Sequence, residues 1–529
     1  MSRSGGSLGG SHTGAAVLGL SALALAVLCV LLYWRPAHAP TSPRATEGSA
    51  SSPGPAALML YCAAGLRAPI AAVAKQYQQE YGVEVQLQYG GSNVLLSQAE
   101  VSRQGDLYLA AEESYTQLAR QKGLLDEVLP IAYMRPVLAV RPGNPKGLRA
   151  LPDLLRDDVR VALADPDAAA VGKVVRGLLQ ASGSWAKLEA QVRRSGVFKP
   201  TVNDVANDVK LGAVDAAFVW DTTVAMVSGL EAVTLPELAG AREQVTLGVL
   251  KSSRQPSAAL RFARYLTARD RGLETLRRAG FRDTIAGDVW EERPTLTLFS
   301  GGVNRLAIQE TLAEFARRED AAVNTVYNGC GILVAQMKGL RKGESRGAFP
   351  DAYFACDVSF MRQVREWFTD EAVFTRTQMV ILAPKGNPRN LRAPADLAQA
   401  GLKVGLANPD ESALGHLCRE LFKEMGVYEA IQKNVATQTP TADLLVNQMK
   451  IGALDAAVVY EVNTVPVRGT LEIIRIEHPK ALARQPYAVA RETPRRQLVL
   501  RLLERLRSPE SRRRYEAAGF QLCIPAEAP

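Results

Sequence analysis

Histidine and closely spaced cysteine are scarce in this sequence of 529 residues. Four histidines and six cysteines are present, and none of them forms a CxxC pair or shows the spacing of metal ligands. The sequence also has no GxxxxGK phosphate-binding loop and no Ser/His/Asp series typical of hydrolases. We therefore expect no metal, no cofactor and no enzymatic activity. A disulfide framework is also unexpected in domains of this size, although a single bridge stays open as an alternative.

Basic residues exceed acidic ones, which gives a net charge of +9. Much of the excess comes from arginines near the C-terminus, namely Arg495, Arg496, Arg501, Arg505, Arg507, Arg512, Arg513 and Arg514. They alternate with Leu498, Leu503 and Leu506, as on the solvent-exposed face of an amphipathic helix. A nucleic-acid-binding module would add aromatic side chains or a known motif to such a basic face. We therefore predict no nucleic-acid partner.

One stretch of the sequence occurs twice. Residues 210–220 read KLGAVDAAFVW and residues 450–460 read KIGALDAAVVY, with 7 of 11 positions identical and an offset of 240 residues. The tripeptide at 279–281, Ala-Gly-Phe, returns at 518–520 with nearly the same offset, 239 residues. A nearly constant offset over so much of the chain indicates the tandem duplication of a whole domain and not a solenoid.

The N-terminal segment differs from the rest of the chain. Residues 1–13 are polar, and residues 14–34 form an uncharged apolar run of 21 residues. As a helix this run would span about 30 Å, the thickness of one bilayer core. We predict an uncleaved single-pass signal anchor at 14–34 and a Pro/Ser/Ala-rich linker at 35–57. A cleavable signal peptide is the alternative, because residues 37–39 read AHA and resemble a cleavage site.

From residue 58 onward, short apolar runs alternate with helical patterns. The first run is followed by a helix that carries Ile70, Val73 and Tyr77 at helical spacing and stops at Gly82. The alternation predicts an α/β fold with mainly parallel sheets. We expect two domains, residues 58–282 and 295–521.

Extended segments interrupt this alternation twice in each copy. We predict that the chain crosses there between two lobes, at 134–140 and 245–250 in the first copy and at 377–383 and 486–490 in the second.

Three loops of the first copy run directly into predicted helix N-termini, after Gly65, after Asn93 and after residues 165–167. A helix N-terminus presents unpaired N–H groups and partial positive charge, which together suit an oxyanion. Glycine at Gly65, Gly90 and Gly91 would permit a close approach of the backbone to a ligand. The alternative is that these are ordinary glycine-rich turns between strands and helices.

An ordered set of motifs identifies a family resemblance. The motifs are YCAAGL at 61–66, YGGSN at 89–93, GDLYLAA at 105–111, DPD at 165–167 and DAAFVW at 215–220. Their order and spacing resemble those of type 2 periplasmic solute-binding proteins, and most of all the molybdate-binding group. The resemblance spans nearly all of each copy. It implies two tandem domains, each with two lobes that close on a small ligand.

The same resemblance assigns five ligand contacts in each copy. In the first copy they fall on Gly65, Ser92, Val171, Val202 and Trp220. In the second copy they fall on Val303, Cys330, Leu414, Ala442 and Tyr460. Gly65 and Trp220 depart from the serine and tyrosine of the family. In the second copy both serine hydroxyls are absent, so we expect a degenerate pocket there.

Four charged residues flank these positions. Arg67 and Arg305 begin equivalent helices and either line the mouth of the cleft or point to solvent. Asp221 and Glu461 follow the site aromatics, and we expect them to cap the next turn or face solvent and not to face an anion.

Two functional hypotheses follow from the resemblance. The first is a protein anchored in the cytoplasmic membrane, with its domains on the periplasmic side. It would capture a small molybdate-like oxyanion for an ABC permease. The second is a sensory or scaffold protein that uses degenerate binding domains to contact partners.

Overall fold

The computed structural model describes residues 57–344 and 348–523. The predicted anchor at 14–34, and the linker up to residue 56, lie outside the described residues. Within the described part of the chain, no helix combines the length and apolar character that a bilayer crossing requires. We call residues 58–282 the first repeat and residues 295–521 the second repeat.

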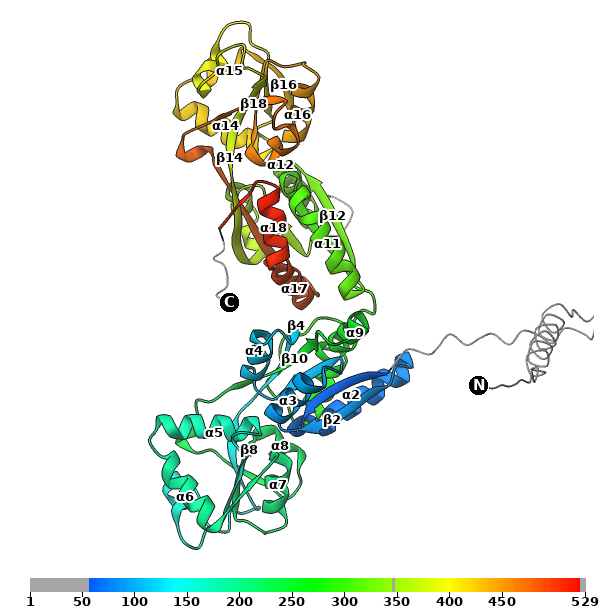
Figure 1. The fold of residues 1–529 in the computed structure, drawn as a ribbon, viewed down its shortest axis with the longest axis vertical. Helices are drawn as coiled ribbons and strands as arrows, with labels where there is room; N and C mark the ends of the chain where they lie inside the picture. The colour runs from blue at the N-terminus through cyan, green and yellow to red at the C-terminus, as the bar shows by residue number, and fades with distance from the viewer. Residues whose placement is uncertain (1–56, 345–347, 524–529) are drawn as a thin grey trace, which may run out of the picture. The chain divides into compact units, whose positions relative to one another are not determined.

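The first lobe of the first repeat contains a five-stranded sheet in the order β2-β1-β3-β10-β4 (Figure 1). The helix α2 ends at Gly82, whose φ of 69° lies in the left-handed region that glycine adopts without a steric cost. The elements of this lobe are β1 (Leu58–Ala63), α2 (Arg67–Tyr81), β2 (Val85–Gly90), α3 (Ser92–Ser102), β3 (Leu107–Ala110), α4 (Ser114–Gln121), β4 (Leu125–Met134), β10 (Glu243–Leu250), α9 (Pro256–Thr267) and α10 (Gly272–Arg278).

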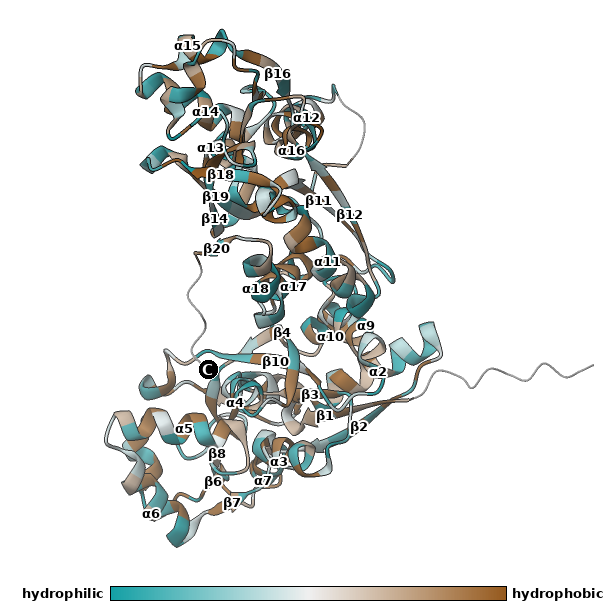
Figure 2. Cartoon of the chain, turned by 45° about the horizontal axis from the view of Figure 1, so that its top comes forward, coloured by the Kyte–Doolittle hydropathy of each residue, from teal (hydrophilic) through white to brown (hydrophobic). Residues whose placement is uncertain are grey.

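The second lobe contains another five-stranded sheet, in the order β7-β6-β8-β5-β9. Its helices pack through apolar stripes; α5, for example, buries Val171, Val175 and Leu179, which are spaced four residues apart. Figure 2 shows the resulting mixture of hydrophobic and hydrophilic residues along the helices. The elements are β5 (Pro136–Val140), β6 (Val161–Ala164), α5 (Ala170–Ala181), α6 (Trp185–Ser195), β7 (Val197–Lys199), α7 (Val202–Lys210), β8 (Ala216–Trp220), α8 (Asp221–Met226) and β9 (Glu231–Val233).

The chain crosses between the lobes twice. At the first crossing only Arg135 separates β4 from β5, which lie in different sheets, and this confirms the crossing predicted at 134–140. The return crossing lies between β9 and β10, so residues 245–250 already belong to the first sheet.

The sheets are mixed, which corrects the expectation of mainly parallel sheets. The strands β1, β2 and β3 pair in parallel, but β10 is antiparallel to both β3 and β4. In the second lobe β6 pairs in parallel with β7 and β8, whereas β5 is antiparallel to β8 and β9. The antiparallel pairs arise because β5 and β10, the strands that enter each lobe after a crossing, run against the direction of its other strands.

The second repeat follows a similar order of elements, but its connection between the lobes differs. Its strand β14 (Phe368–Pro384) runs without a break through both lobes, and this joins the two sheets into one of ten strands. The other elements are β11 (Thr295–Gly301), α11 (Arg305–Glu319), β12 (Ala322–Asn328), α12 (Cys330–Lys342), β13 (Ala352–Phe354), α13 (Val358–Arg362), β15 (Val404–Ala407), α14 (Ala413–Glu424), α15 (Tyr428–Gln432), β16 (Val435–Thr439), α16 (Ala442–Lys450), β17 (Ala456–Tyr460), β18 (Leu471–Arg475), β19 (Leu482–Ala490), α17 (Arg496–Leu506), α18 (Pro509–Ala517) and β20 (Gln521–Leu522).

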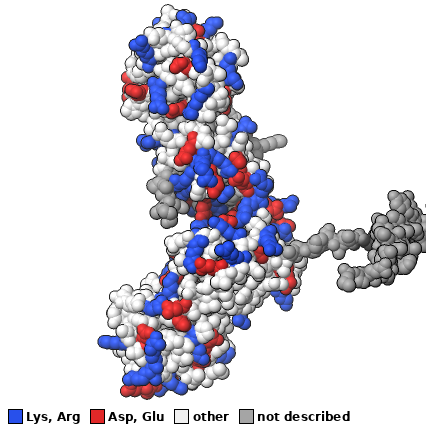
Figure 3. Space-filling model, viewed as in Figure 1, with Lys and Arg blue, Asp and Glu red and all other residues white. Residues whose placement is uncertain are grey.

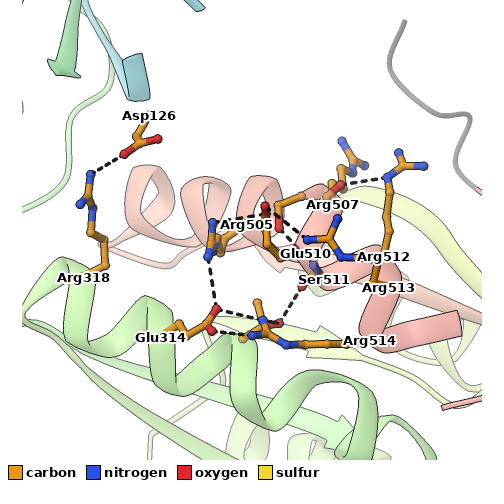
Figure 4. Close-up of polar contacts among 12 residues, drawn as sticks. Asp126, Glu314, Arg318, Arg505, Arg507, Glu510, Ser511, Arg512, Arg513 and Arg514 are labelled. Carbon is orange, nitrogen blue, oxygen red and sulfur yellow. Dashed lines mark hydrogen bonds and ion pairs between the residues drawn. The ribbon is translucent and has the colours of Figure 1, made fainter. Parts of the chain in front are cut away.

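The expectation that the C-terminal arginines form a solvated helix face is wrong for Arg501. Arg501 on α17 is buried and donates to both carboxylate oxygens of Glu319 on α11. Arg505 and Arg514 both contact the carboxylate of Glu314, at 3.2 and 2.9 Å (Figure 4). On the face drawn in Figure 3, basic and acidic side chains are interspersed. Arg501 therefore stabilises the interior of the fold, whereas the other seven arginines are partly or fully exposed.

Direct contacts also join the two repeats. The guanidinium of Arg264 on α9 donates to the carbonyl oxygens of Glu292 and Glu319, at 3.2 and 3.1 Å. Arg318 on α11 pairs with Asp126 and Glu127 of β4, at 3.1 and 2.8 Å. The main helices of the second repeat are thus tied to the first lobe of the first repeat.

Candidate functional site

Gly65 brings three of the predicted contacts of the first repeat together. It follows β1 in the first lobe, whereas Val202 begins α7 and Trp220 ends β8 in the second lobe. A Cβ atom on Gly65 would lie 3.1 Å from Val202 Cγ1 and 3.4 Å from Trp220 Cδ1. A serine at this position, as in the family, would therefore press against Val202, which gives a physical reason for the glycine.

Ser92 is buried at the N-terminus of α3. Its Oγ accepts the N–H of Ala111 at 3.3 Å, and its carbonyl accepts the Tyr108 hydroxyl at 2.8 Å. Burial raises the pKa of Tyr108 well above its ordinary value, so this hydroxyl stays a neutral donor. Because Ser92 Oγ uses a lone pair for Ala111, its own hydrogen is the atom it can offer to a ligand.

The two lobes of the first repeat touch beside these residues. The N–H of Asn93 donates to the Ala168 carbonyl at 3.1 Å, and its side-chain amide donates to the Asp167 carbonyl at 2.7 Å. A Cβ atom on Gly91 would lie 2.3 Å from the Ala168 oxygen. Gly91 was expected to let the backbone approach a ligand, but it lets one lobe approach the other. The two lobes of the first repeat are therefore closed on each other.

A hollow of about 460 Å³ opens beside this contact. Gly65 lines it, together with Arg67, Tyr89, Asn203 and Asp204. The other four predicted contacts are buried, with Ser92, Val171 and Trp220 each 1% exposed and Val202 5% exposed. The predicted ligand contacts are therefore buried where the lobes close, and the hollow lies beside them.

Arg67 occupies the mouth of the cleft, one of the two positions considered for it. Its guanidinium lies 4.3 Å from the ring centroid of Tyr89, and Arg305 lies 5.5 Å from the ring of Tyr327 in the second repeat. Asn203 was not predicted; its amide donates to the Ala64 carbonyl across the lobes at 2.8 Å. The signal was present in the sequence, since Asn203 follows the predicted contact Val202 directly.

We call the contact between the two lobes of a repeat the seam. The second repeat has an equivalent seam that is formed by different side chains. The N–H of Gly331 donates to the Glu411 carbonyl at 2.9 Å, as Asn93 does to Ala168. Cys330 begins α12 as Ser92 begins α3, and its Sγ accepts the N–H of Cys356 at 3.0 Å. Leu414, Ala442 and Tyr460 are buried, and Val303 is partly buried.

Tyr460 gives the second site a polar group. Its ring is 2% exposed, and its hydroxyl has no hydrogen-bond partner among the described residues. Burial raises the pKa of Tyr460 well above its ordinary value, so the hydroxyl keeps its hydrogen at any physiological pH. A buried hydroxyl without a partner is costly, and a ligand oxygen would satisfy it.

The acidic residues after the site aromatics do not face the ligand positions. Asp221 begins α8, and its carboxylate accepts the N–H groups of Arg135 and Thr222, at 3.1 and 2.9 Å. Glu461 pairs with Arg475 at 3.2 Å. Asp221 therefore bonds backbone N–H groups at the start of the next helix, whereas the ion pair of Glu461 was not predicted. In the described part of the chain, no group of three or more His, Cys, Asp or Glu residues is placed to hold a metal ion.

Comparisons with known proteins agree with this architecture. The family model for bacterial extracellular solute-binding proteins matches residues 58–282 and again residues 296–521. A protein of Haemophilus influenzae named "Putative binding protein" is 31% identical over 203 residues, which cover 38% of this chain and 81% of that protein. The molybdate-binding protein ModA of Mycobacterium tuberculosis is 26% identical over 265 residues, or 50% of this chain and 95% of that protein.

Among solved structures, the periplasmic molybdate-binding protein of Azotobacter vinelandii aligns with 42% of this chain and 98% of its own, at 18% identity. The TM-score of that alignment is 0.37, too low to carry an argument. The assignment rests on the two matches of the family model, which together span most of the sequence. This chain belongs to the bacterial extracellular solute-binding protein family.

Proposed function

We propose that this protein captures a small tetrahedral oxyanion, of the molybdate or sulfate type, for an ABC importer. The observation that carries the proposal is the closed contact between the lobes of the first repeat. Gly65 of one lobe lies against Val202 and Trp220 of the other, and Ser92 is buried next to Asn93, which bonds across the lobes. The seam offers a hydroxyl and helix N-termini and no metal ligands, which suits an anion. The relatives named as molybdate-binding proteins support the same class of ligand.

Capture by lobe closure is part of the proposal. Asn93 and Asn203 each donate across the seam to backbone carbonyls of the opposite lobe. A ligand that bridges the lobes adds to these bonds in the closed form alone, so it shifts the population toward closure. No chemical step is required.

We further propose that residues 14–34 anchor the chain in the cytoplasmic membrane, with residues 58–282 and 295–521 as two binding domains on the periplasmic side. N-terminal sequencing of the mature protein, together with protease treatment of intact spheroplasts, tests this topology. A soluble mature protein that begins near Pro40 would contradict the anchor.

Isothermal titration calorimetry of residues 58–529 tests the ligand class. Molybdate, tungstate, sulfate and phosphate are titrated separately, with chloride as the control for ionic strength. We expect saturable heat with at least one tetrahedral dianion and none with chloride. Absence of binding for all four at millimolar concentration would refute oxyanion capture.

A sensory or scaffold role is the second candidate, favoured by the loss of both serine hydroxyls at Val303 and Cys330. The same titration separates the two, since a scaffold has no need of an anion in either repeat.

A further inference from the structure

Two thiols meet in the second repeat where the first repeat has one hydroxyl. Cys330 and Cys356 lie with their Sγ atoms 2.7 Å apart, and both side chains are buried. Ala111 and Cys356 are equivalent, because each stands two residues beyond matching positions of β3 and β13 in the sheet register. The pair of Ser92 and Ala111 has therefore become a pair of cysteines at the same point of the cleft.

Gly301 leaves room for the two cysteine side chains. Gly301 ends β11 where Ala63 ends β1. A Cβ atom on Gly301 would lie 2.1 Å from Cys356 Sγ and 3.0 Å from Cys330 Sγ. An alanine could not be accommodated beside both sulfur atoms, so the missing methyl group is what lets the two thiols approach each other.

The surroundings make Cys330 the more reactive of the two. Burial opposes ionisation of Cys330, yet its hydrogen bonds with the thiol and with the backbone N–H of Cys356 outweigh this effect, and the net result is a lowered pKa. The hydrogen bond to Cys330 and burial raise the pKa of Cys356 well above its ordinary value. The position of Cys330 at the N-terminus of the 13-residue helix α12 also favours a thiolate.

The other buried cysteines of the described chain provide a contrast. Cys62 and Cys418 lie in the core, and burial raises the pKa of each thiol. Neither has a second sulfur within hydrogen-bond distance in the described part of the chain. They serve as internal controls for reactivity that depends on a paired thiol.

We propose that Cys330 and Cys356 form a reversible disulfide inside the second ligand cleft. The oxidant is a disulfide of a small thiol or of a protein. The Cys330 thiolate attacks one sulfur of the external disulfide and releases one thiol, which leaves a mixed disulfide on Cys330. Cys356 then loses its proton and attacks the Cys330 sulfur, which expels the second external thiol. Two protein thiols become one disulfide, and one external disulfide becomes two thiols.

The bond changes the ligand site directly. Both S–H hydrogens leave, so the position equivalent to Ser92 can no longer donate a hydrogen bond. Because both sulfur atoms are buried at the seam, attack requires the lobes to part and the bond between Gly331 and Glu411 to break. The consequence for ligand binding rests on the proposed function, whereas the disulfide itself does not.

The test uses the full-length chain in buffers of oxidised and reduced glutathione. Samples are quenched in acid, alkylated, digested without reduction and analysed by mass spectrometry. We expect the peptides that contain Cys330 and Cys356 to become joined in oxidising buffer and to separate again with dithiothreitol. Cys62 and Cys418 should stay as alkylated thiols.

Two variants and a second oxidant sharpen this test. Cys330→Ser should abolish the joined peptide, while Cys418→Ser should leave its yield unchanged. Diamide, a small membrane-permeant oxidant of thiols, replaces glutathione in a parallel series to overcome limited access. Recovery of both peptides as free thiols with both oxidants would overturn the proposal, as would a bridge from Cys330 to any other cysteine.

Calorimetry then compares the reduced and oxidised chains with the anion that the reduced chain binds. We expect oxidation to weaken whatever binding the second repeat shows and to leave the affinity of the first repeat unchanged. If no anion binds even the reduced chain, the proposed function fails while the mass-spectrometric result still decides the disulfide.

Discussion

Arg501 and Glu319 form a buried, bidentate ion pair. Nε of Arg501 lies 2.6 Å from one carboxylate oxygen and Nη2 lies 3.0 Å from the other, with the two side chains 8% and 1% exposed. Arg264 approaches the same carboxylate at 3.6 Å from the first repeat. One buried carboxylate thus faces two buried guanidinium groups.

The first prediction concerns this carboxylate. Replacing it in Glu319→Gln leaves two buried guanidinium groups without their negative partner, which typically costs about 3–5 kcal/mol of folding free energy. Urea unfolding followed by circular dichroism measures the loss. Glu189→Gln, which removes the surface partner of Arg193, is the control and should change little. Equal stability of Glu319→Gln and the parent would contradict the prediction.

The second prediction concerns the two ligand sites. Ser92→Ala removes a hydrogen bond to a charged ligand, which typically costs about 1.5–3 kcal/mol, or about ten- to hundredfold in affinity. The first repeat keeps this hydroxyl and the second does not, so Ser92→Ala should weaken the tighter of two binding events. Ser97→Ala, on an exposed position of the same helix, is the control. A Ser92→Ala variant that binds like the parent would remove Ser92 from the site.

The third prediction concerns closure. Asn203→Ala and Asn93→Ala together remove two side-chain hydrogen bonds that join the lobes of the first repeat. Each such bond contributes about 0.5–1.5 kcal/mol, so the open form should gain population. Small-angle scattering should show a larger radius of gyration for the double variant. Asn207→Ala, one turn further along α7 and exposed, should leave the profile unchanged.

The fourth prediction concerns Gly65. Gly65→Ser introduces the family's hydroxyl, but its Cβ would lie only 3.1 Å from Val202. We expect the single variant to melt at a lower temperature and to gain no affinity. Combination with Val202→Ala should recover stability and bind the anion more tightly than the parent. Tighter binding by Gly65→Ser alone would contradict this prediction, because it would mean that Val202 can move away from the added side chain.

The repeated stretch and the motif order were sufficient to predict the tandem α/β plan, and the extended segments predicted the first crossing between the lobes. The return crossing was misplaced, because residues 245–250 belong to β10 in the first sheet. These patterns were not sufficient to predict sheet direction, because the partner of β10 is chosen by contacts across more than a hundred residues. Arg501 was assigned to solvent for a similar reason, since its partner Glu319 lies 182 residues earlier.

The candidate site shows the same limit at shorter range. Cys330 was identified through its equivalence with Ser92, but its neighbour Cys356 was not, although only 26 residues separate them. Cys330 begins α12 and Cys356 follows β13, and the two approach each other only when β11 pairs with β13. The spacing of the two cysteines in the sequence therefore does not predict that their side chains lie close together.

The unbroken strand β14 has a mechanical consequence. In the first repeat the link between the lobes is interrupted at Arg135, and Pro136 has no N–H with which to continue a ladder. That link can swivel about a few backbone torsions. In the second repeat the link is stiff, because bending β14 must distort its hydrogen-bonded pairing with β19 before residue 378 and with β17 after it. The two clefts of one chain should therefore differ in stiffness, with the second moving through a narrower arc and storing more elastic energy when it opens.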